Sequence, residues 1–416
     1  MKCMKNIEGA ARDPVPGKWF FLCAFIFACF LFWWLPSVLF RIVVHRADAV
    51  DDATVVISIV ALCLFAGGFL LPVSRRPARQ APEAILDACG GFAYGATLLL
   101  FVPATLAAIQ QWHARAAIDY GMGGAIPRPV QAILYTHLFS GFLFLGAANP
   151  EKQGWRQIAI AATAVILPRF IVSLHGGRFF LAQAVVPALL IAIARGWIKL
   201  SLKRIVQVAL LALAIVFGPS MSRGDPLIGQ DEILTFFAAG SSLQLFQDNT
   251  DLNLNGYCPP LIVSLTAKTI PYGAMGVCVL DIAGLKNMPA TLSRILTVND
   301  PSSYEGTVSG TGSNYLLDLY LFGGMPAVYI GSAVFGFSCR RFMHWIGMRS
   351  LLAGIWAECL TRALFAPRND LGYVYERIPS LLLATLLVVA AVWCGRLLLC
   401  ASLMAGTMEA PAPSTG

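Results

Sequence analysis

Long apolar runs alternate with short polar connections along most of this chain. The runs reach about 20 residues and lack the period-two alternation of a membrane β-strand, which predicts helices that cross a lipid bilayer. Ten such runs are predicted spans, at residues 19–40, 53–72, 84–110, 130–148, 157–174, 178–194, 205–221, 315–337, 351–366 and 379–401. The pattern therefore predicts an all-α, polytopic transmembrane bundle of about 10 spans.

One interval, residues 222–312, interrupts this pattern between the seventh and eighth predicted spans. Residues 257–285 within it are apolar again, and they contain Pro259, Pro260, Pro271 and Lys268. Prolines interrupt a helix, and a charge in its middle is costly in lipid. We therefore expect a re-entrant or interfacial hairpin here, with an additional span as the alternative.

Composition supports a membrane protein. The 416 residues are 57% hydrophobic and 12% charged, whereas a soluble protein carries about 25% charged residues. The net charge of +8 does not indicate nucleic-acid binding, because the basic residues lie in short clusters between the spans. The 11 cysteines show no metal-ligand spacing, so neither a metal nor another cofactor is predicted. A disulfide between Cys258 and Cys278 is possible outside the cytoplasm, with two free thiols as the alternative.

The distribution of basic residues predicts the orientation. With the N-terminus in the cytoplasm and sides alternating, the cytoplasmic segments hold twice as many Lys and Arg as the short outer connections. We therefore expect both ends of the chain in the cytoplasm and the long loop outside. The organisation is then a cytoplasmic N-terminus (1–18), spans 1–7 (19–221), an outer loop (222–312), which the resemblance described below makes periplasmic in a bacterial inner membrane, spans 8–10 (313–403) and a cytoplasmic tail (404–416).

Six arginines are predicted on or near the outer side of the bundle. Arginine near lipid is costly unless it meets an anion or water, and its planar fork suits a phosphate group. Together they predict a site for a diphosphate headgroup, although each alone could pair with a lipid phosphate or a nearby acid. They are Arg169, Arg178, Arg223, Arg294, Arg362 and Arg368.

Arg178 and Arg223 are the most informative of these arginines. Arg178 follows His175 and two glycines in a turn that leads directly into the sixth span, where a helix N-terminus also favours an anion. Arg223 follows the seventh span at the beginning of the long loop. His175 is a weaker candidate for a base, because a lone histidine is more often structural.

Carboxylates on the same side supply candidates for a catalytic base. Asp318 differs from the loop acids because it lies in the first turn of an apolar helix, where simple helix-dipole stabilisation is the alternative role. Asp225 and Glu232 follow Arg223 in the loop. We predict Asp318, Asp225 and Glu232 as catalytic candidates, and Tyr315 as a substrate-binding residue beside the six arginines.

The chain lacks the sequence motifs of phosphate-loop, zinc-peptidase, serine-hydrolase and dinucleotide-binding sites. It resembles, instead, the Wzy-type O-antigen polymerases, which join oligosaccharide repeat units. The resemblance depends on the many spans with one long late loop, on the HGGR turn at Arg178, and on the passage TGSNYLLDLYLFGGMPAVYIGSAVFG.

The resemblance implies a GT-C-like bundle and a nucleotide-independent glycosyltransferase. It would transfer a growing glycan from undecaprenyl diphosphate to another undecaprenyl-diphosphate-linked repeat unit, in O-antigen or exopolysaccharide synthesis. Its partners would be the lipid-linked oligosaccharide, the bilayer, a chain-length regulator and a flippase. Three alternatives remain: an O-antigen ligase, a lipid-linked oligosaccharide flippase or other transporter, and a non-enzymatic envelope assembly protein.

Overall fold

The computed structural model describes residues 17–35, 50–73, 82–119, 128–174, 178–198, 207, 246–247, 314–369 and 371–375, with short stretches between 378 and 397. Among these residues the regular elements are helices, which confirms the all-α prediction. Four described helices are long and apolar enough to cross a membrane, or five if one bent pair counts as a single span. The total of about ten spans and the GT-C-like arrangement remain predictions.

The helices before the long loop follow the predicted spans closely. Asp51 and Asn149 begin two of them, each accepting a hydrogen bond from a backbone N–H in the first turn. The observed elements are α2 (Lys18–Cys29) continued by η1 (Phe30–Trp34), α4 (Asp52–Leu70), α5 (Glu83–Leu99), α6 (Phe101–Asp119), α7 (Arg128–Ala147), α8 (Pro150–Ser173) and α9 (Arg178–Ala194).

The third predicted span, 84–110, is bent. The axes of α5 and α6 differ by 49°. Pro103 explains the break, because a proline lacks the N–H for the helical bond to Leu99 and its ring displaces that carbonyl. After the long loop the chain forms α16 (Tyr315–Gly347), α17 (Ala353–Ala363), η4 (Ala366–Arg368) and α18 (Leu371–Tyr375).

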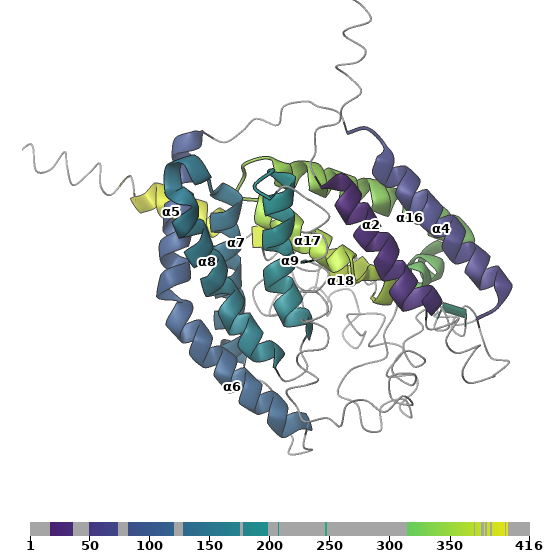
Figure 1. Cartoon of the computed structure of the whole chain (residues 1–416), viewed down its shortest axis with the longest axis horizontal. Coiled ribbons are helices and arrows are strands. Elements are labelled where there is room, and N and C mark those ends of the chain that lie inside the picture. The colour runs from purple at the N-terminus through teal and green to yellow at the C-terminus, as the bar shows by residue number, and fades with distance from the viewer. Residues whose placement is uncertain are drawn as a thin grey trace, which may run out of the picture.

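Two groups of helices flank a central element. In Figure 1, α5, α6, α7 and α8 lie on one side, α2, α4 and α16 on the other, and α17 with α9 between them. The contacts agree, since α17 packs against α9, α16 and α7. Nearly every residue of α17 is buried, so this helix is enclosed by protein rather than by lipid.

Close packing joins α4 to α16. A Cβ on Gly68 would overlap the backbone of Ala333, and a Cβ on Gly336 would overlap the backbone of Phe65. Small residues allow membrane helices to approach this closely. The ring of Phe65 also stacks on that of Phe25, with 3.9 Å between the centroids, so that α2 joins the same packing.

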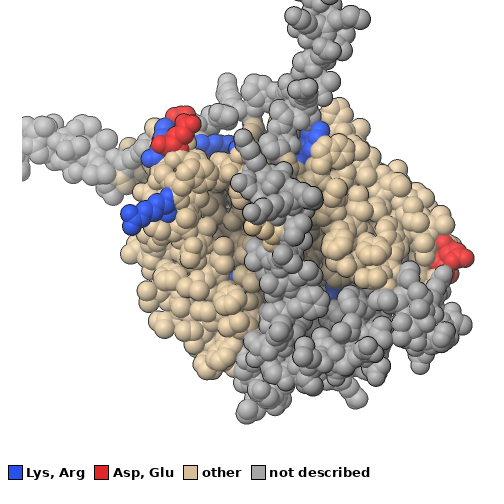
Figure 2. All heavy atoms as spheres, viewed as in Figure 1, with Lys and Arg blue, Asp and Glu red and all other residues tan. Residues whose placement is uncertain are grey.

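The outer surface is apolar. Leu99, Leu106 and Ile330 are 80%, 63% and 67% exposed. Figure 2 shows a broad uncharged surface, with the charged side chains of the described residues mostly at its upper edge. Apolar side chains facing outwards over whole helices indicate a lipid environment, and the protein is therefore a helical membrane protein.

Candidate functional site

The glycine pair Gly323–Gly324 reverses the direction of the chain within α16. Gly324 has φ 65° and ψ −158°, a conformation available to glycine alone. The rings of Tyr315 and Phe335 are 5.3 Å apart between centroids, whereas 20 residues of one straight helix would separate them by about 30 Å. Residues 315–322 therefore fold back along residues 325–347.

This reversal differs from the predicted eighth span, 315–337. The continuous helix 325–347 is about 34 Å long, enough to cross the hydrocarbon core of a bilayer. Arg340, which the sequence placed in a connection, is thus inside the helix and 1% exposed. The hydropathy pattern did not distinguish a reversal at two glycines from glycines used for helix packing.

The folded-back segment carries two predicted site residues, Tyr315 and Asp318. Asn314 caps the segment by accepting a hydrogen bond from the backbone N–H of Leu317, at 2.8 Å. Asp318 is 3% exposed, and its carboxylate accepts a hydrogen bond from the backbone N–H of Leu371, at 3.2 Å. Asp318 therefore links the beginning of α16 to the chain that follows α17.

The helix is also interrupted after α17. The 11 residues of α17 would extend about 16 Å, which is too short to cross the membrane, and a 3-10 turn follows it at Ala366–Arg368. The indole N–H of Trp33 donates to the carbonyl of Pro367 at 2.8 Å. Trp33 also lies beside Tyr315, with ring centroids 5.7 Å apart. Non-helical backbone at membrane depth is tolerated only inside protein or along a cavity.

A buried ion pair lies on α17. The Nε atom of Arg362 donates to Oε1 of Glu358 at 2.8 Å, and the side chains are 1% and 5% exposed. Gln183 of α9 donates its amide N–H to the same carboxylate oxygen at 3.2 Å. Because α17 is enclosed, these charges face protein on all sides, where an ion pair is stable only with good geometry.

Two acceptor atoms of this group lack donors. Oε2 of Glu358 and Oε1 of Gln183 are buried and have no hydrogen-bond partner. An unsatisfied buried acceptor costs about 1–3 kcal/mol. Turning the Gln183 amide over would bring two oxygens together, so either orientation leaves a polar atom unsatisfied. We call Glu358, Arg362 and Gln183 the Glu358 cluster.

Arg169, another predicted site residue, is buried elsewhere. It donates to the backbone carbonyl of Leu134 at 3.1 Å and lies over the rings of Tyr135 and Phe180, at 4.8 and 5.7 Å from their centroids. Its neighbours belong to α7 and α9, near the helix ends that the topology assigns to the outer side. These contacts hold the guanidinium over aromatic rings, where cation–π attraction favours it.

The predicted arginines thus divide among several surroundings. Arg362 lies in the Glu358 cluster, Arg169 among aromatic rings, and Arg368 over the ring of Phe32 at 5.8 Å. The side-chain contacts described here for the three arginines have no residue in common. Arg178 begins α9 as predicted. The other predicted site residues, Arg223, Asp225, Glu232 and Arg294, lie outside the described residues, as do His175, Cys258, Cys278 and the predicted 257–285 hairpin.

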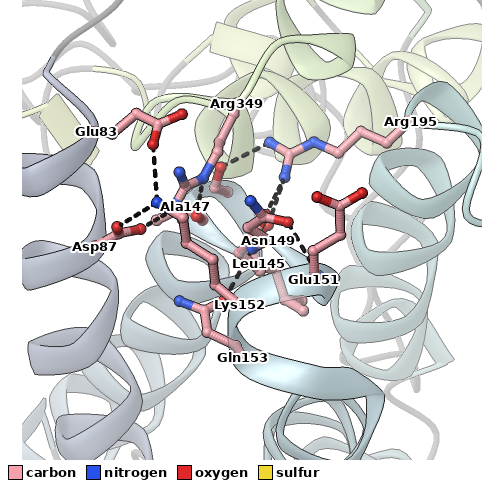
Figure 3. Close-up of polar contacts among 12 residues, drawn as sticks. Glu83, Asp87, Leu145, Ala147, Asn149, Glu151, Lys152, Gln153, Arg195 and Arg349 are labelled. Carbon is pink, nitrogen blue, oxygen red and sulfur yellow. Dashed lines mark hydrogen bonds and ion pairs between the residues drawn. The ribbon is translucent and has the colours of Figure 1, made fainter.

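A second polar cluster lies where the C-terminal end of α9 meets the ends of α7 and α16 (Figure 3). The guanidinium of Arg195 donates to five backbone carbonyls at the ends of α7 and α16, at 2.7 to 3.3 Å. Cations are favoured at helix C-termini, where carbonyls lack intrahelical partners. Burial and the nearby charge of Arg349 lower the pKa of Arg195 to about 10, so it stays protonated at neutral pH. We call this group the Arg195 cluster.

Ion pairs extend the Arg195 cluster to α5 and α8. Lys152 pairs with Glu83 at 2.8 Å and with Asp87 at 3.0 Å, and Arg349 also binds Asp87. The helix ends joined here all belong to one side in the alternating topology that the sequence predicts. Nothing in the sequence indicated that Arg195 would meet the end of α16, because the two are far apart along the chain.

The chain was compared with protein-family models, curated proteins and solved structures. No protein-family model matches the chain, and neither a curated protein nor a solved structure is similar to it.

Proposed function

We propose that this membrane protein is a polymerase of undecaprenyl-diphosphate-linked oligosaccharide repeat units, acting at the periplasmic side of the bacterial inner membrane. The single observation that supports it best is the burial of Asp318, Arg362 and Glu358 at two broken helices within the bundle. Charged groups inside a membrane protein are costly, and they mark sites of binding or chemistry. The sequence resemblance supplies the reaction.

In this proposal the arginines bind the diphosphate of the donor lipid. Arg178 at the beginning of α9, together with Arg223 and Arg294 of the loop, would meet the headgroup at the membrane surface. A guanidinium stabilises the charge that develops on the departing diphosphate. The departure of that group drives the transfer, so neither a nucleotide nor a metal is required.

A carboxylate would take the proton of the acceptor hydroxyl. Among the candidates predicted from sequence, Asp318 is a buried carboxylate that also holds the chain after α17 in place. Asp225 and Glu232 are the loop candidates for the same role. The periplasmic location and the chain-length regulator as partner belong to the proposal as well.

The test is chain growth by purified protein in proteoliposomes. Lipid-linked single repeats, extracted from a strain that lacks the gene, serve as substrate, and products are separated by size. We expect a ladder of lengths from wild-type protein, and no ladder from the Arg178→Ala and Arg223→Ala variants at equal protein level. Transfer to lipid A–core without chain growth would identify a ligase and reject the polymerase.

One observation favours a second candidate, a flippase for the same lipid-linked oligosaccharide. Transporters often place their substrate at discontinuous helices, and α16 reverses direction at Gly323–Gly324 beside buried Asp318. The same proteoliposomes separate the two functions. Movement of labelled lipid-linked repeat across the bilayer without any increase in length would support the flippase.

A further inference from the structure

The inference concerns Glu358, which neither the sequence motifs nor the resemblance marked as a site residue, and it rests on the proposed polymerase. Its carboxylate is used on one oxygen only. Oε1 accepts from Arg362 and Gln183, while Oε2 has no donor. Glu358 is 4% exposed and Gln183 is 1% exposed, so both acceptor atoms lie away from the protein surface.

The two unsatisfied atoms are both acceptors, and this limits what fits them. A phosphate or another carboxylate offers no N–H or O–H and would be repelled by Glu358. A hydroxyl group offers one donor, and a sugar offers several. Oε2 of Glu358 and Oε1 of Gln183 can therefore each accept a hydrogen bond from a hydroxyl-bearing ligand. An anion would instead bind the arginines predicted at the helix ends.

Arg362 prepares Glu358 for such a role. The bond from its Nε to Oε1 restrains the rotation of the carboxylate, and Gln183 holds the same oxygen from α9. Oε2 is thus the oxygen left to meet an acceptor hydroxyl. The short helix α17 carries both charges, and its enclosure by α7, α9 and α16 keeps them away from lipid.

We propose that Glu358 and Gln183 form the subsite for the acceptor sugar. Oε2 of Glu358, in place of the sequence candidates Asp318, Asp225 and Glu232, then takes the proton from the attacking hydroxyl, while Asp318 holds the chain after α17. In this step the O–H bond of the acceptor breaks and its proton passes to Oε2. The acceptor oxygen forms a bond to the anomeric carbon of the donor. The bond from that carbon to the phosphate oxygen breaks, and undecaprenyl diphosphate leaves with the electron pair. Glu358 then releases its proton to water.

The first test compares Glu358→Gln with wild type in the proteoliposome assay, using the lipid-linked single repeats described above. Gln keeps a carbonyl oxygen for Arg362 but is not a base. We expect a loss of at least about 100-fold in rate per folded molecule, since general-base catalysis contributes about that much or more. Glu83→Gln in the Arg195 cluster is the matched control, and it should retain the wild-type rate.

The pH profile separates a base from a structural ion pair. The wild-type rate should fall at acidic pH, as general-base catalysis requires, and the residual rate of Glu358→Gln should be flat over that range. Glu358→Asp, which keeps the carboxylate, should restore part of the rate. A Glu358→Gln rate within threefold of wild type, or an acidic fall that persists in that variant, would overturn the proposal.

Gln183→Met tests the acceptor subsite, because it removes the amide while keeping the volume. We expect about a tenfold higher KM for the lipid-linked repeat with a smaller change in kcat; an unchanged KM would count against the subsite.

If wild-type protein makes no ladder, the polymerase itself is rejected. Binding of the same repeat, followed by tryptophan fluorescence, then decides the subsite: weaker binding by Gln183→Met supports it, and equal binding rejects it.

Discussion

The Arg195 cluster and the Glu358 cluster each contain a buried guanidinium, but the hydrogen-bonding groups around the two guanidinium groups differ in how many have partners. All five N–H groups of Arg195 meet backbone carbonyls, and those carbonyls are the unpaired ends of α7 and α16. In the Glu358 cluster two buried acceptors have no donor. In the Arg195 cluster the one buried polar atom without a partner among the described residues is a donor, Nη1 of Arg349, whereas the two in the Glu358 cluster are acceptors, which a hydroxyl-bearing ligand could satisfy.

The two clusters also lie in different surroundings, one at partly exposed helix ends and the other on an enclosed helix. The Arg195 cluster joins helix ends and continues into the partly exposed ion pairs of Lys152 and Asp87. The Glu358 cluster lies on an enclosed, short helix whose following segment is irregular. Substitutions in the first should therefore reduce stability, and substitutions in the second should reduce activity beyond any loss of stability.

The largest effect on stability is expected for Arg195→Gln. Hydrogen bonds from a charged donor are worth about 1.5–3 kcal/mol each, and Gln can replace at most two of the five. With at least three bonds lost, we expect the free energy of unfolding, measured by denaturation in detergent, to fall by more than about 5 kcal/mol. Arg156→Gln, at an exposed position of α8, is the control and should be close to wild type. A stable Arg195→Gln protein would refute the structural role of the cluster.

The second-largest loss of stability is expected for Arg362→Gln. Removing one partner of a buried ion pair leaves the other charge unpaired, which costs about 3–5 kcal/mol. The double variant Arg362→Gln with Glu358→Gln removes both charges and should recover much of that loss, as thermal unfolding of both proteins would show. Chain growth should stay absent in the double variant. Recovery of activity together with stability would mean that the Glu358 cluster is only structural.

A smaller effect is expected at the reversal of α16. Gly324→Ala introduces a Cβ where the backbone has φ 65°, which should destabilise the protein by about 1–3 kcal/mol. Gly91→Ala on α5 is the matched control, because a Cβ there meets no atom within 4 Å. It should be neutral or stabilise the helix by up to about 1 kcal/mol. Equal stabilities for the two variants would argue against the reversal.

The smallest effect is expected for Glu83→Gln. Its ion pair with Lys152 is largely exposed, with side chains 74% and 46% accessible, and water and salt screen such pairs so that they contribute little to stability. The difference in unfolding free energy from wild type should shrink further at high salt, because exposed charges are screened. A loss as large as that of Arg195→Gln would show that the Arg195 cluster depends on its exposed ion pairs.

The hydropathy pattern was enough to predict the helical membrane class and most boundaries of the described helices. Hydropathy is a local property, so α4, α7 and α9 lie within a few residues of the predicted spans. It also drew attention to Asp318 and Arg362, because a charge within an apolar run needs a physical reason. The i, i+4 spacing of Glu358 and Arg362 was visible in the sequence and is the signal that could have predicted their ion pair.

How these elements meet depends on the packing of the whole bundle. The reversal at Gly323–Gly324 brings Tyr315 to Phe335. The packing of α9 against α17 and α16 brings Gln183 to Glu358 and Arg195 to the end of α16. Each contact joins residues that are distant along the chain, and their pairing depends on how whole helices pack. A local pattern of polar and apolar residues carries no information about such pairs.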